Sequence, residues 1–431
     1  MIWIYRLLFP FVLLVLSPYY LLRMRRRGGY ARGFLHRFGA VPLMPRRTAG
    51  TRRVWLQAVS VGEMLAIEPI LRALKNDGTE VFLSTTTSTG YRIATDRYPN
   101  LVTAVGYFPI DWMPFSRRAW DAVAPDLAII TEGERWPEHL WQAKRRKVPV
   151  LCINARISDR SFKRLRHLPP AARFVTQGIT RLLAGSALDA ERFLALGIPA
   201  DRVEVTGNIK LDVTIAPLDP AARAALSREL GLREDRLVLL GSSTWPGEEA
   251  ALLDVLVAAR EKGMAVSLLL VPRHAERRHE LEKLLKASTL AYHFRSRGPA
   301  PAEVDIAVGD TTGELRAMTQ LADLVFVGKS LPPHTEGQTP VEAATLGKAI
   351  IFGGGMANFR AIAQDLLARG AARSVVDAPG LQEQALGLLA DRAGRDGMAE
   401  AASGWRRDNQ GGVERTLAAI RREFARINKA G

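Results

Sequence analysis

The sequence predicts an α/β protein in which an apolar amino-terminal helix precedes two domains built on mainly parallel sheets. Its 431 residues, 47% of them hydrophobic, suffice for two domains with sizeable cores. From residue 53 onward, short apolar runs alternate with stretches of helical spacing, the pattern of parallel strands joined by covering helices. Arg6 is the only charged residue among the first 22.

Those 22 residues, MIWIYRLLFPFVLLVLSPYYLL, would extend roughly 33 Å as a helix, about the thickness of a bilayer core. Pro10 and Pro18 weaken the helix without excluding a membrane span. A cleaved signal peptide is the alternative, but the positive charge lies mainly after the apolar run and no A-x-A-like site ends it. We therefore expect residues 1–24 to form a retained membrane anchor.

Positive charge gathers on the carboxyl side of this run, at Arg23, Arg25, Arg26, Arg27, Arg32 and Arg37. By the positive-inside tendency, we expect a single-pass anchor with the rest of the chain in the cytoplasm. The lone cysteine, Cys152, cannot form an internal disulfide, which suits a reducing compartment. The net charge of +16 fits an anionic membrane surface or anionic substrates. Because the chain has no zinc-ligand spacing, RNP signature or aromatic-interleaved basic run, we expect no nucleic-acid partner.

Two series of apolar runs predict the strands. The first comprises VWLQAV, EVFLSTT, LVTAVGYFPI, LAIITEG, VPVLCINA, RLLAGS and RVEVTGN. The second comprises LVLLGSS, AVSLLLVPR, AYHFRS, DIAVGD, DLVFVGKS, AIIFGGG and ARSVVD. The segment from Pro217 to Pro220 separates them, so we place the domains at residues 45–216 and 221–431. The final stretch GVERTLAAIRREFARINKA predicts an amphipathic helix that either packs back on the first domain or lies on a membrane surface.

The run LQAVSVGE places a carboxylate directly after a glycine, where a strand passes into a helix. In open α/β sheets, ligands bind at such strand ends. Glu63 is therefore a candidate site residue, and Gly62 leaves room for close approach of a substrate. The alternative is structural, because an acid in a first helical turn complements the helix dipole.

Three further loops of the first domain carry polar groups after predicted strands. TEGERWPE offers Glu132 and Glu134, either as solvated loop acids or as desolvated site acids. NARISDRS offers Asn154, Arg156, Ser158 and Arg160, which suit carboxylate or phosphate oxygens but fit an ordinary surface turn equally well. TGNIKLD offers Lys210, which either balances a leaving phosphate or is simply solvated.

In the second domain the pattern favours a nucleotide. VPRH brings Arg273 to a strand end, where an anion-binding role and a surface role are equally open. GDTTGEL couples a turn to a helix start, so the N–H groups of Gly313 and Glu314 can receive a phosphate, although Glu314 can equally be a helix cap. GQTPVE starts a helix near Pro340 with Glu342 in its first turn. This arrangement suits a nucleotide, because the helix dipole can face a phosphate and the Glu342 carboxylate can bind ribose hydroxyls.

No sequence pattern predicts a metal site. His274 and His279 are five residues apart and lack a third ligand nearby. The chain has no Walker A sequence, no G-x-G-x-x-G and no D-x-D that would indicate a metal-held nucleotide sugar. We therefore expect neither a metal nor another cofactor.

The order of these segments resembles the Kdo transferases, membrane-anchored glycosyltransferases of lipopolysaccharide synthesis with a GT-B fold. The matching segments span nearly the whole chain: AVSVGE, TTTSTG, TEGERWP, NARISDRS, TGNIKLD, SSTWPGEE, VPRH, GDTTGEL, and GQTPVE followed by NF. The resemblance implies two Rossmann-like domains facing across a cleft. It also implies an enzyme at the cytoplasmic face of the inner membrane, which moves 3-deoxy-D-manno-oct-2-ulosonic acid (Kdo) from CMP-Kdo to the lipid A precursor lipid IVA with inversion.

The resemblance also implies roles for individual residues. Glu63 matches the proton acceptor, and Glu134 and Lys210 match positions of transition-state stabilisation. The expected CMP contacts are Pro272, Arg273, Gly313, Glu314, Leu315, Thr339 and Glu342. On their chemistry, the expected substrate contacts are Gly62, Arg156 and Ser158. Because CMP leaves with a single phosphate, arginine, lysine and helix N-termini can stabilise it without a divalent ion.

Two departures from the family pattern leave the donor open. Glu336-Gly337-Gln338-Thr339 stands where the family usually has G-G-H-N, so Thr339 replaces the asparagine that usually contacts the nucleotide. SSTWPGEE has Trp245 and Pro246 where a histidine and often an acid are usual. The alternatives are a GT-B transferase of another nucleotide sugar and a non-catalytic membrane scaffold that binds nucleotide.

Overall fold

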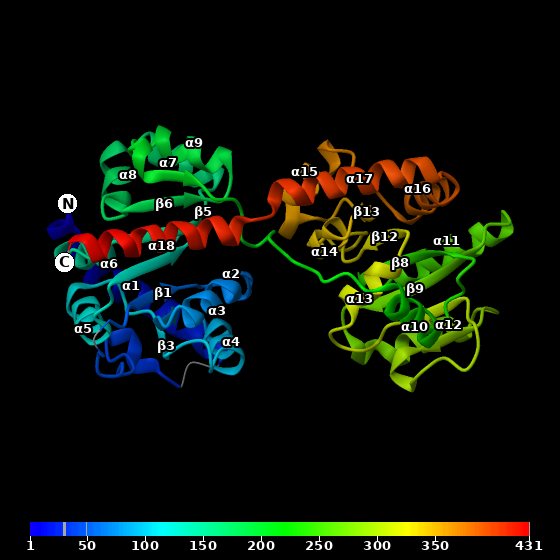
Figure 1. Ribbon diagram of the computed structural model, residues 1–431, viewed down its shortest axis with the longest axis horizontal. Coiled ribbons are helices and arrows are strands. Elements are labelled where there is room, and N and C mark those ends of the chain that lie inside the picture. The colour runs from blue at the N-terminus through cyan, green and yellow to red at the C-terminus, as the bar shows by residue number, and fades with distance from the viewer. Residues whose placement is uncertain (29–31, 49, 431) are drawn as a thin grey trace. The chain divides into compact units, whose positions relative to one another are not determined.

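The computed structural model describes residues 1–28, 32–48 and 50–430 (Figure 1). The chain forms two compact units: unit 1 comprises Met1–Asp212 and Gln410–Gly431, and unit 2 comprises Val213–Asn409. Each unit contains a seven-stranded sheet, and all the strand pairs described are parallel. All of these strands fall on predicted apolar runs, so the predicted α/β class is confirmed.

The sheet of unit 1 has the order β3-β2-β1-β4-β5-β6-β7. Its strands are β1 (Arg53–Gln57), β2 (Glu80–Thr85), β3 (Ala104–Tyr107), β4 (Leu127–Thr131), β5 (Val150–Ala155), β6 (Arg181–Ala184) and β7 (Val203–Val205). Its helices are α1 (Ile2–Arg27), α2 (Val61–Ala66), α3 (Glu68–Asn76), α4 (Ser88–Arg97), α5 (Met113–Val123), α6 (Pro137–Arg145), α7 (Asp159–Arg166), α8 (Pro169–Thr176), α9 (Ala187–Ala195) and α18 (Gly412–Ala430), with 3-10 turns η1 (Phe34–Phe38) and η2 (Ala200–Arg202).

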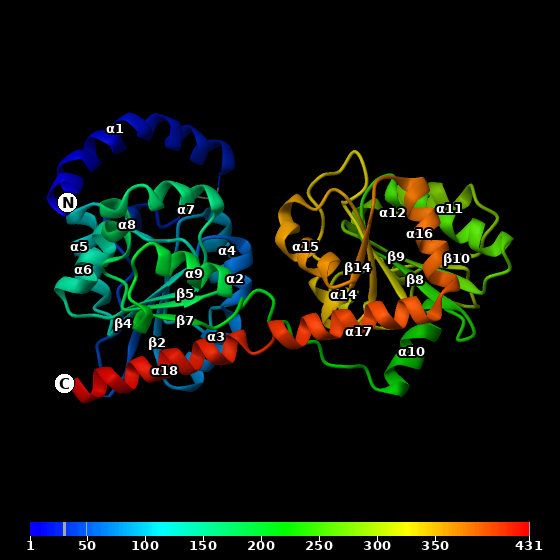
Figure 2. The same ribbon diagram turned by 90° about the horizontal axis from the view of Figure 1, so that it is seen from above.

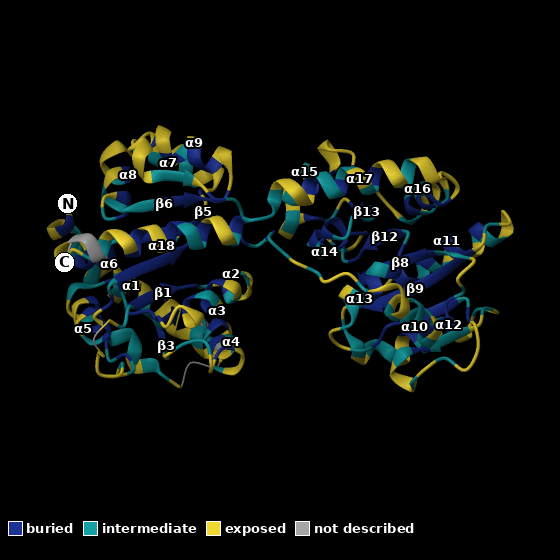
Figure 3. Ribbon diagram, viewed as in Figure 1, coloured by how far each residue is buried: buried dark blue, intermediate teal, exposed yellow. Residues whose placement is uncertain are grey.

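Helices bury both faces of this sheet. Successive strand residues point to opposite faces, so Trp55 belongs to one core cluster and its neighbour Leu56 to another. The buried strands are dark in Figure 3, whereas the outer faces of the helices are exposed. Burial on both faces explains why these strands read as continuous apolar runs rather than as alternating patterns.

The carboxyl-terminal helix α18 belongs to unit 1, although the predicted second domain, 221–431, includes it. Its apolar stripe, with Ile420 and Phe424, joins the same core cluster as Leu71 of α3. Asp212 fixes its start by accepting hydrogen bonds from the N–H of Gly411 at 3.1 Å and of Val413 at 2.7 Å. Of the two placements that the sequence left open for this helix, it takes the one on the first domain.

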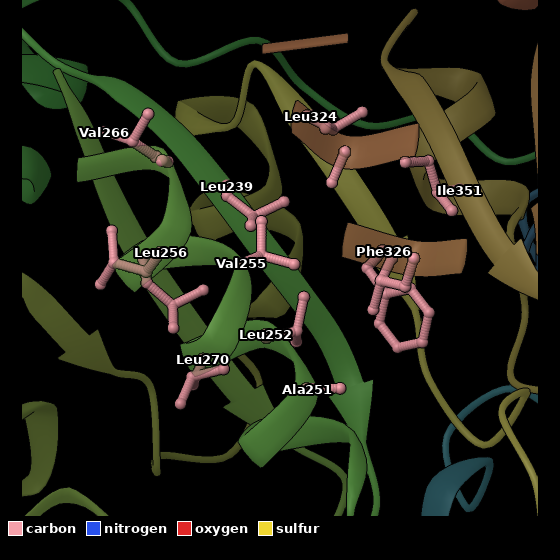
Figure 4. Packing of buried hydrophobic residues seen from close by; sticks show 14 of the residues in the cluster. Leu239, Ala251, Leu252, Val255, Leu256, Val266, Leu270, Leu324, Phe326 and Ile351 are labelled. Carbon is pink, nitrogen blue, oxygen red and sulfur yellow. The ribbon is translucent and has the colours of Figure 1, made fainter. Parts of the chain in front are cut away.

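The sheet of unit 2 has the order β10-β11-β9-β8-β12-β13-β14. Its strands are β8 (Leu237–Thr244), β9 (Val266–Pro272), β10 (Tyr292–Phe294), β11 (Ile306–Val308), β12 (Leu324–Val327), β13 (Ala349–Gly353) and β14 (Ala372–Val375). Its helices are α10 (Pro220–Leu230), α11 (Glu248–Glu261), α12 (Arg278–Lys286), α13 (Leu315–Leu321), α14 (Val341–Thr345), α15 (Arg360–Ala368), α16 (Ala378–Ala390) and α17 (Arg392–Asn409), with 3-10 turns η3 (Ala275–Arg277), η4 (Arg295–Arg297) and η5 (Ala357–Phe359). Figure 4 shows its core, where Leu252 and Val255 of α11 pack on Leu239 and Phe326 of the sheet.

Both sheets have a point where the strand order reverses. In unit 1, β1 lies between β2 and β4, and in unit 2, β8 lies between β9 and β12. The helices that follow the strands on either side of such a point lie on opposite faces, which opens a crevice at the carboxyl ends of the strands. The loops after β1 and β4, and those after β8 and β12, are therefore the favoured positions for ligands.

Helix α1 contains both Pro10 and Pro18 and forms the predicted apolar element. Its segment Ile2–Leu22 is long and apolar enough to cross a membrane, a test that signal sequences also pass, and 6% of its most apolar window is buried. Figure 2 shows α1 running along one side of unit 1. Arg25 and Arg32 are exposed, and the side chains of Arg23, Arg26 and Arg27 lie outside the described part of the chain.

His139 of α6 makes unit 1 sensitive to acid. Its ring lies in the aromatic core, 1% exposed, and its Nδ1 accepts a hydrogen bond from Trp120 Nε1 at 3.1 Å. Burial lowers the pKa of His139 from 6.5 to about 3. Between these values the unfolded chain binds a proton that the folded chain does not, so stability falls as the pH falls.

We therefore expect the thermal unfolding midpoint of the wild type to fall with pH below about 6.5, and that of His139→Gln to fall less steeply. His167→Gln, at an exposed position, is the matched control and should keep the wild-type slope. Equal slopes in the wild type and His139→Gln would contradict the prediction.

Candidate functional site

Glu63 lies in the first turn of α2, directly beyond β1. Ser60 is the cap of this helix: its Oγ accepts a hydrogen bond from Glu63 N at 3.2 Å, and the Glu63 carboxylate accepts one from Ser60 N at 3.4 Å. This reciprocal capping box fixes the side chain, which is 8% exposed. Within its own turn, Glu63 therefore acts as the sequence's structural alternative expects, as an acid at the start of a helix.

The same carboxylate reaches across the point where the strand order reverses. Besides Ser60 N, it accepts hydrogen bonds from Val59 N at 3.0 Å, from Ser60 Oγ at 2.7 Å and from Thr131 Oγ1 at 2.5 Å. Thr131 is the last residue of β4, so this bond joins the two adjacent strand ends. Either hydroxyl can rotate away, which leaves a lone pair of the carboxylate for a substrate hydroxyl.

Glu134 lies near Glu63 in the loop after β4. Its Oε2 accepts a hydrogen bond from Trp136 Nε1 at 2.8 Å and a longer one from Gln57 Nε2 at 3.5 Å. Burial raises the pKa of the Glu134 carboxyl; the Trp136 hydrogen bond opposes this, and the Glu63 and Glu132 carboxylates raise the pKa further. Two predicted site acids are thus close enough to influence each other.

Lys210 forms an ion pair with Glu132 in the turn after β7. Asn154, at the end of β5, holds this turn: its Nδ2 donates to Glu132 Oε1 at 3.2 Å and its Oδ1 accepts from Ile209 N at 3.2 Å. A Cβ atom added at Gly62 would lie 3.8 Å from Lys210 Nζ. The fold therefore brings the ammonium group beside the Glu63 turn.

Two residues of this network have left-handed backbone. Glu132 has φ 51° and Asn154 has φ 49°, a region that costs a glutamate on the order of 1 kcal/mol or more. Such strain gathers at functional sites, where the surrounding contacts hold it. The sequence places Asn154 among the polar groups after β5, but as a contact to substrate oxygens rather than as a support of this turn. It does not single out Thr131, whose only signal is a polar residue at the end of an apolar strand.

Arg156 and Ser158 are exposed in the loop after β5. Ser158 caps α7 by accepting a hydrogen bond from Ser161 N at 3.2 Å. Among the described contacts, none joins either residue to Glu63, Glu134 or Lys210. Their predicted role as substrate contacts stays a prediction.

A pocket beside this loop contains an arginine that we had not predicted. Its volume is about 300 Å³, and its lining residues are Gly133, Arg135, Ser161, Arg164, Leu165 and Val175. Within the described residues, the buried Nη1 of Arg135 has no hydrogen-bond partner. Burial lowers the pKa of Arg135. A buried guanidinium with an unused N–H donor is suited to bind an anionic group.

In unit 2, the predicted phosphate turn leads into α13 at Leu315. Gly313 has φ 95°, which favours glycine, and Glu314 is the helix cap. The Glu314 carboxylate accepts hydrogen bonds from Thr311 Oγ1 and from Arg295 Nη2, and these lower its pKa. Glu314 thus stands at the cap position of α13, but its side chain bonds these two neighbours and makes no capping hydrogen bond to the helix. Pro272 is buried at the end of β9, and Arg273 after it is exposed.

The second predicted nucleotide turn leads into α14. Thr339 Oγ1 accepts a hydrogen bond from Val341 N at 3.3 Å, and Glu342 lies in the first turn of the helix. Glu342 Oε1 lies 3.6 Å from Nε of Arg316 on α13. This ion pair joins the two turns, so the fold brings the predicted CMP contacts of α13 and α14 together.

Glu248, at the start of α11, holds the loop after β12. It is 1% exposed and accepts hydrogen bonds from the N–H groups of Lys329 at 2.8 Å, Ser330 at 2.8 Å, Leu331 at 3.1 Å and Trp245 at 2.9 Å. Burial raises the pKa of Glu248, and the four donors oppose this. The residue lies within SSTWPGEE, but nothing in the sequence separated it from its neighbouring acid.

Trp245, one of the two departures from the family pattern, lies at the same point. Its ring centroid is 5.2 Å from that of His274 and 5.7 Å from that of His334, and Lys329 Nζ lies 4.2 Å from it. The indole therefore joins the loops after β8, β9 and β12. Among residues 1–28, 32–48 and 50–430, no group of three or more histidine, cysteine, aspartate or glutamate side chains is arranged to hold a metal ion.

Comparison with known proteins decides the family. A family model described as 3-deoxy-D-manno-octulosonic-acid transferase (kdotransferase) matches residues 32–213. The 3-deoxy-D-manno-octulosonic acid transferase of Bordetella pertussis is 34% identical over 378 residues, covering 85% of this chain and 86% of the relative. The chain belongs to this transferase family. The Haemophilus influenzae transferase of the same name is 30% identical over 411 residues, covering 94% and 92%.

Membership of the Kdo transferase family confirms the predicted resemblance and the predicted class of enzyme, a glycosyltransferase. UDP-GlcNAc 2-epimerase from Neisseria meningitidis has a similar structure, with a TM-score of 0.55, 14% identity, and coverage of 87% of this chain and 100% of its own. At that identity the likeness shows the fold alone, and with the two parallel sheets it confirms the predicted GT-B class.

Glu248→Ala tests the support of the β12 loop. We expect it to lower the free energy of unfolding by roughly 3 kcal/mol, because buried N–H groups lose their acceptor. Glu261→Ala, an exposed acid at the other end of α11, is the control and should change little. Denaturant unfolding of both variants measures the effect; equal stability would show that the loop does not depend on Glu248.

Proposed function

We propose that this member of the Kdo transferase family transfers Kdo from CMP-Kdo to the lipid A precursor lipid IVA, with inversion at the anomeric carbon. The observation that carries the proposal is the grouping of the hydrogen-bonded Glu63 carboxylate, a partly desolvated Glu134 and the Lys210 ammonium at the carboxyl ends of the unit 1 strands. An acid that only caps a helix needs neither of those neighbours.

Glu63 acts as the general base. It accepts the proton of the acceptor hydroxyl as that oxygen attacks the anomeric carbon of Kdo, and the bond from that carbon to the CMP phosphate oxygen breaks. CMP takes the electron pair of the broken bond and leaves with the negative charge. The attacked face is opposite the leaving group, so one displacement inverts the configuration.

Lys210 and Glu134 stabilise charge in this step. The ammonium of Lys210 lies beside the Glu63 turn, where a cation stabilises the negative charge that develops on the reacting oxygens. Glu134, whose pKa is raised, is able to hold a proton or to balance the positive charge that grows on the sugar ring. Arg156 and Ser158 contact the anionic substrates, and the Arg135 pocket accepts an anionic group of the acceptor.

Unit 2 binds the nucleotide. The N–H groups at the start of α13 and the Arg273 guanidinium face the phosphate, while Thr339 and Glu342 contact the rest of CMP. The ion pair between Arg316 and Glu342 supports one continuous nucleotide site, since it joins the two turns. The reaction needs no metal or cofactor.

The enzyme works at the cytoplasmic face of the inner membrane. Helix α1 supports this location because its exposed apolar side chains suit the lipid interior. The arginines that follow the helix support it as well, because they suit anionic lipid headgroups. The acceptor, lipid IVA, is itself a membrane lipid with phosphates, so attachment places the enzyme where the acceptor is.

The test is product formation by mass spectrometry. Purified protein in detergent is incubated with lipid IVA and either CMP-Kdo or a UDP-sugar. We expect lipid IVA to gain Kdo-sized mass increments with CMP-Kdo only, and the number of increments gives the number of sugars added. Transfer from the UDP-sugar alone would replace the donor, and binding of CMP without any transfer would favour a scaffold.

A further inference from the structure

The amino terminus of α1 is tied to unit 1. Arg6 forms a two-pronged ion pair with Glu138 of α6: Nε lies 2.7 Å from Oε2, and Nη2 lies 2.9 Å from Oε1. The Arg6 side chain is 10% exposed and that of Glu138 is fully buried. Tyr5 Oη donates to Asp111 Oδ2 at 2.8 Å, and Ile2 is 6% exposed. The first turns of α1 are therefore part of the unit 1 surface.

The chain returns to the same place after α1. The N–H of Ile110 donates to the carbonyl of Arg37 at 2.8 Å, and Phe38 packs edge-on against Phe115 with ring centroids 5.2 Å apart. Ile110 is next to Asp111, the partner of Tyr5. Residues 5 and 37 are thus held by adjacent residues of one loop, although an apolar helix lies between them.

These two attachments conflict with a single membrane crossing. A span of Ile2–Leu22 that leaves unit 1 on one side puts Tyr5 and Arg6 on the other side or in the hydrocarbon. That arrangement abandons Glu138 as a buried carboxylate without its cation, a large loss. If the attachments instead persist, the chain after Arg27 must recross the bilayer in about ten residues, with backbone groups that hydrocarbon cannot satisfy.

The middle of α1 nevertheless requires an apolar partner. Its exposed side chains include Leu7 at 67%, Phe11 at 64%, Leu14 at 71% and Val15 at 76%, whose spacing of i, i+4, i+7 and i+8 places them on one face of the helix. A continuous apolar surface of this size marks an interaction with a membrane or another protein. No acidic residue occurs before Glu63, whereas arginines follow the helix closely, so the charge complements an anionic bilayer surface.

We propose that α1 is an in-plane membrane helix: it enters the lipid from the side of unit 1, lies within one leaflet, and returns to that side. Its occupant is the headgroup and acyl region of an anionic bilayer. This inference refines the membrane attachment in the proposed function and replaces the predicted single-pass anchor. It does not depend on Kdo transfer, so failure of the transferase assay leaves it untouched.

Site-specific labelling tests the topology. Cys152 is fully buried, and burial raises its pKa to about 12, so it should not react with a maleimide in the folded protein. Labelling therefore reports on each single added cysteine. The reporters are a cysteine inserted after Met1, Leu14→Cys and Arg32→Cys. They are exposed to a membrane-impermeant maleimide in inside-out inner-membrane vesicles and in right-side-out spheroplasts.

We expect the reporters at the two ends to react in inside-out vesicles only, and the Leu14→Cys reporter to react in neither preparation until detergent is added. An end reporter that reacts only in spheroplasts would overturn the proposal in favour of a single pass. A soluble dimer in which the two end reporters react and the Leu14→Cys reporter stays protected would overturn it in favour of a second copy of the chain covering the apolar surface.

A second measurement asks whether the ion pair of Arg6 is present in the membrane. Arg6→Leu should make unit 1 roughly tenfold or more faster to cleave by protease in inside-out vesicles, because Glu138 loses its buried partner. Arg47→Leu is the matched control, since Arg47 pairs with Asp126 at the surface. Cleavage of Arg6→Leu at the control rate would show that α1 leaves unit 1 in the bilayer and would overturn the proposal.

Discussion

Glu63→Gln should reduce Kdo transfer by about 100-fold to 10,000-fold, the range of a lost general base. The amide cannot accept the proton of the acceptor hydroxyl, whereas donor binding in unit 2 is left in place. Rates of lipid IVA conversion and CMP affinity, both measured on the purified variant, separate these two properties. We expect the affinity for CMP to match that of the wild type.

The control must account for the capping box, because Glu63→Gln also weakens the start of α2. Ser60→Ala removes the cap oxygen but keeps the carboxylate, and a lost cap costs about 1 kcal/mol. We expect Ser60→Ala to unfold as readily as Glu63→Gln yet retain most of its activity. If both variants lose activity in proportion to their stability, Glu63 is a structural residue and the proposed base is wrong.

Lys210→Met should reduce transfer by about 100-fold or more, the cost of removing one preorganised group that stabilises developing charge. Lys210→Arg keeps the charge but changes its shape, so we expect it to recover only part of the rate. Initial rates at saturating lipid IVA give the effect on the chemical step.

Lys210 is also the partner of Glu132, so its loss has a second route to low activity. A double-mutant cycle with Glu132→Gln separates the two routes. If Lys210 acts on the reacting atoms, Lys210→Met with Glu132→Gln stays as slow as Lys210→Met alone. Recovery in the double variant would show that Lys210 merely neutralises the Glu132 carboxylate, and the proposed role would be wrong.

The individual site residues illustrate how far sequence reasoning reaches. The spacing of Glu63 after a strand placed it at a strand end, but base and cap both require an acid in the first helical turn, so no local pattern separates them. Its bond to Thr131 comes from a strand 68 residues away. Contacts of that kind depend on strand order, which an apolar run does not encode. The same reason explains why Glu248 and its four N–H donors, most of them some 80 residues away, went unrecognised.

The sequence by itself determined the secondary structure of this protein: the strand runs, the final helix at 412–430 and the apolar first helix all follow from local periodicity and composition. It also determined the family, since the motif order survives in the linear chain. Tertiary structure alone decided that α18 joins unit 1, that Lys210 meets Glu132, and that Tyr5 and Arg37, on either side of the apolar helix segment, attach to one loop. Local patterns record which face of an element is apolar. Which partner covers that face, and which charge meets which, is fixed only when distant segments pack together.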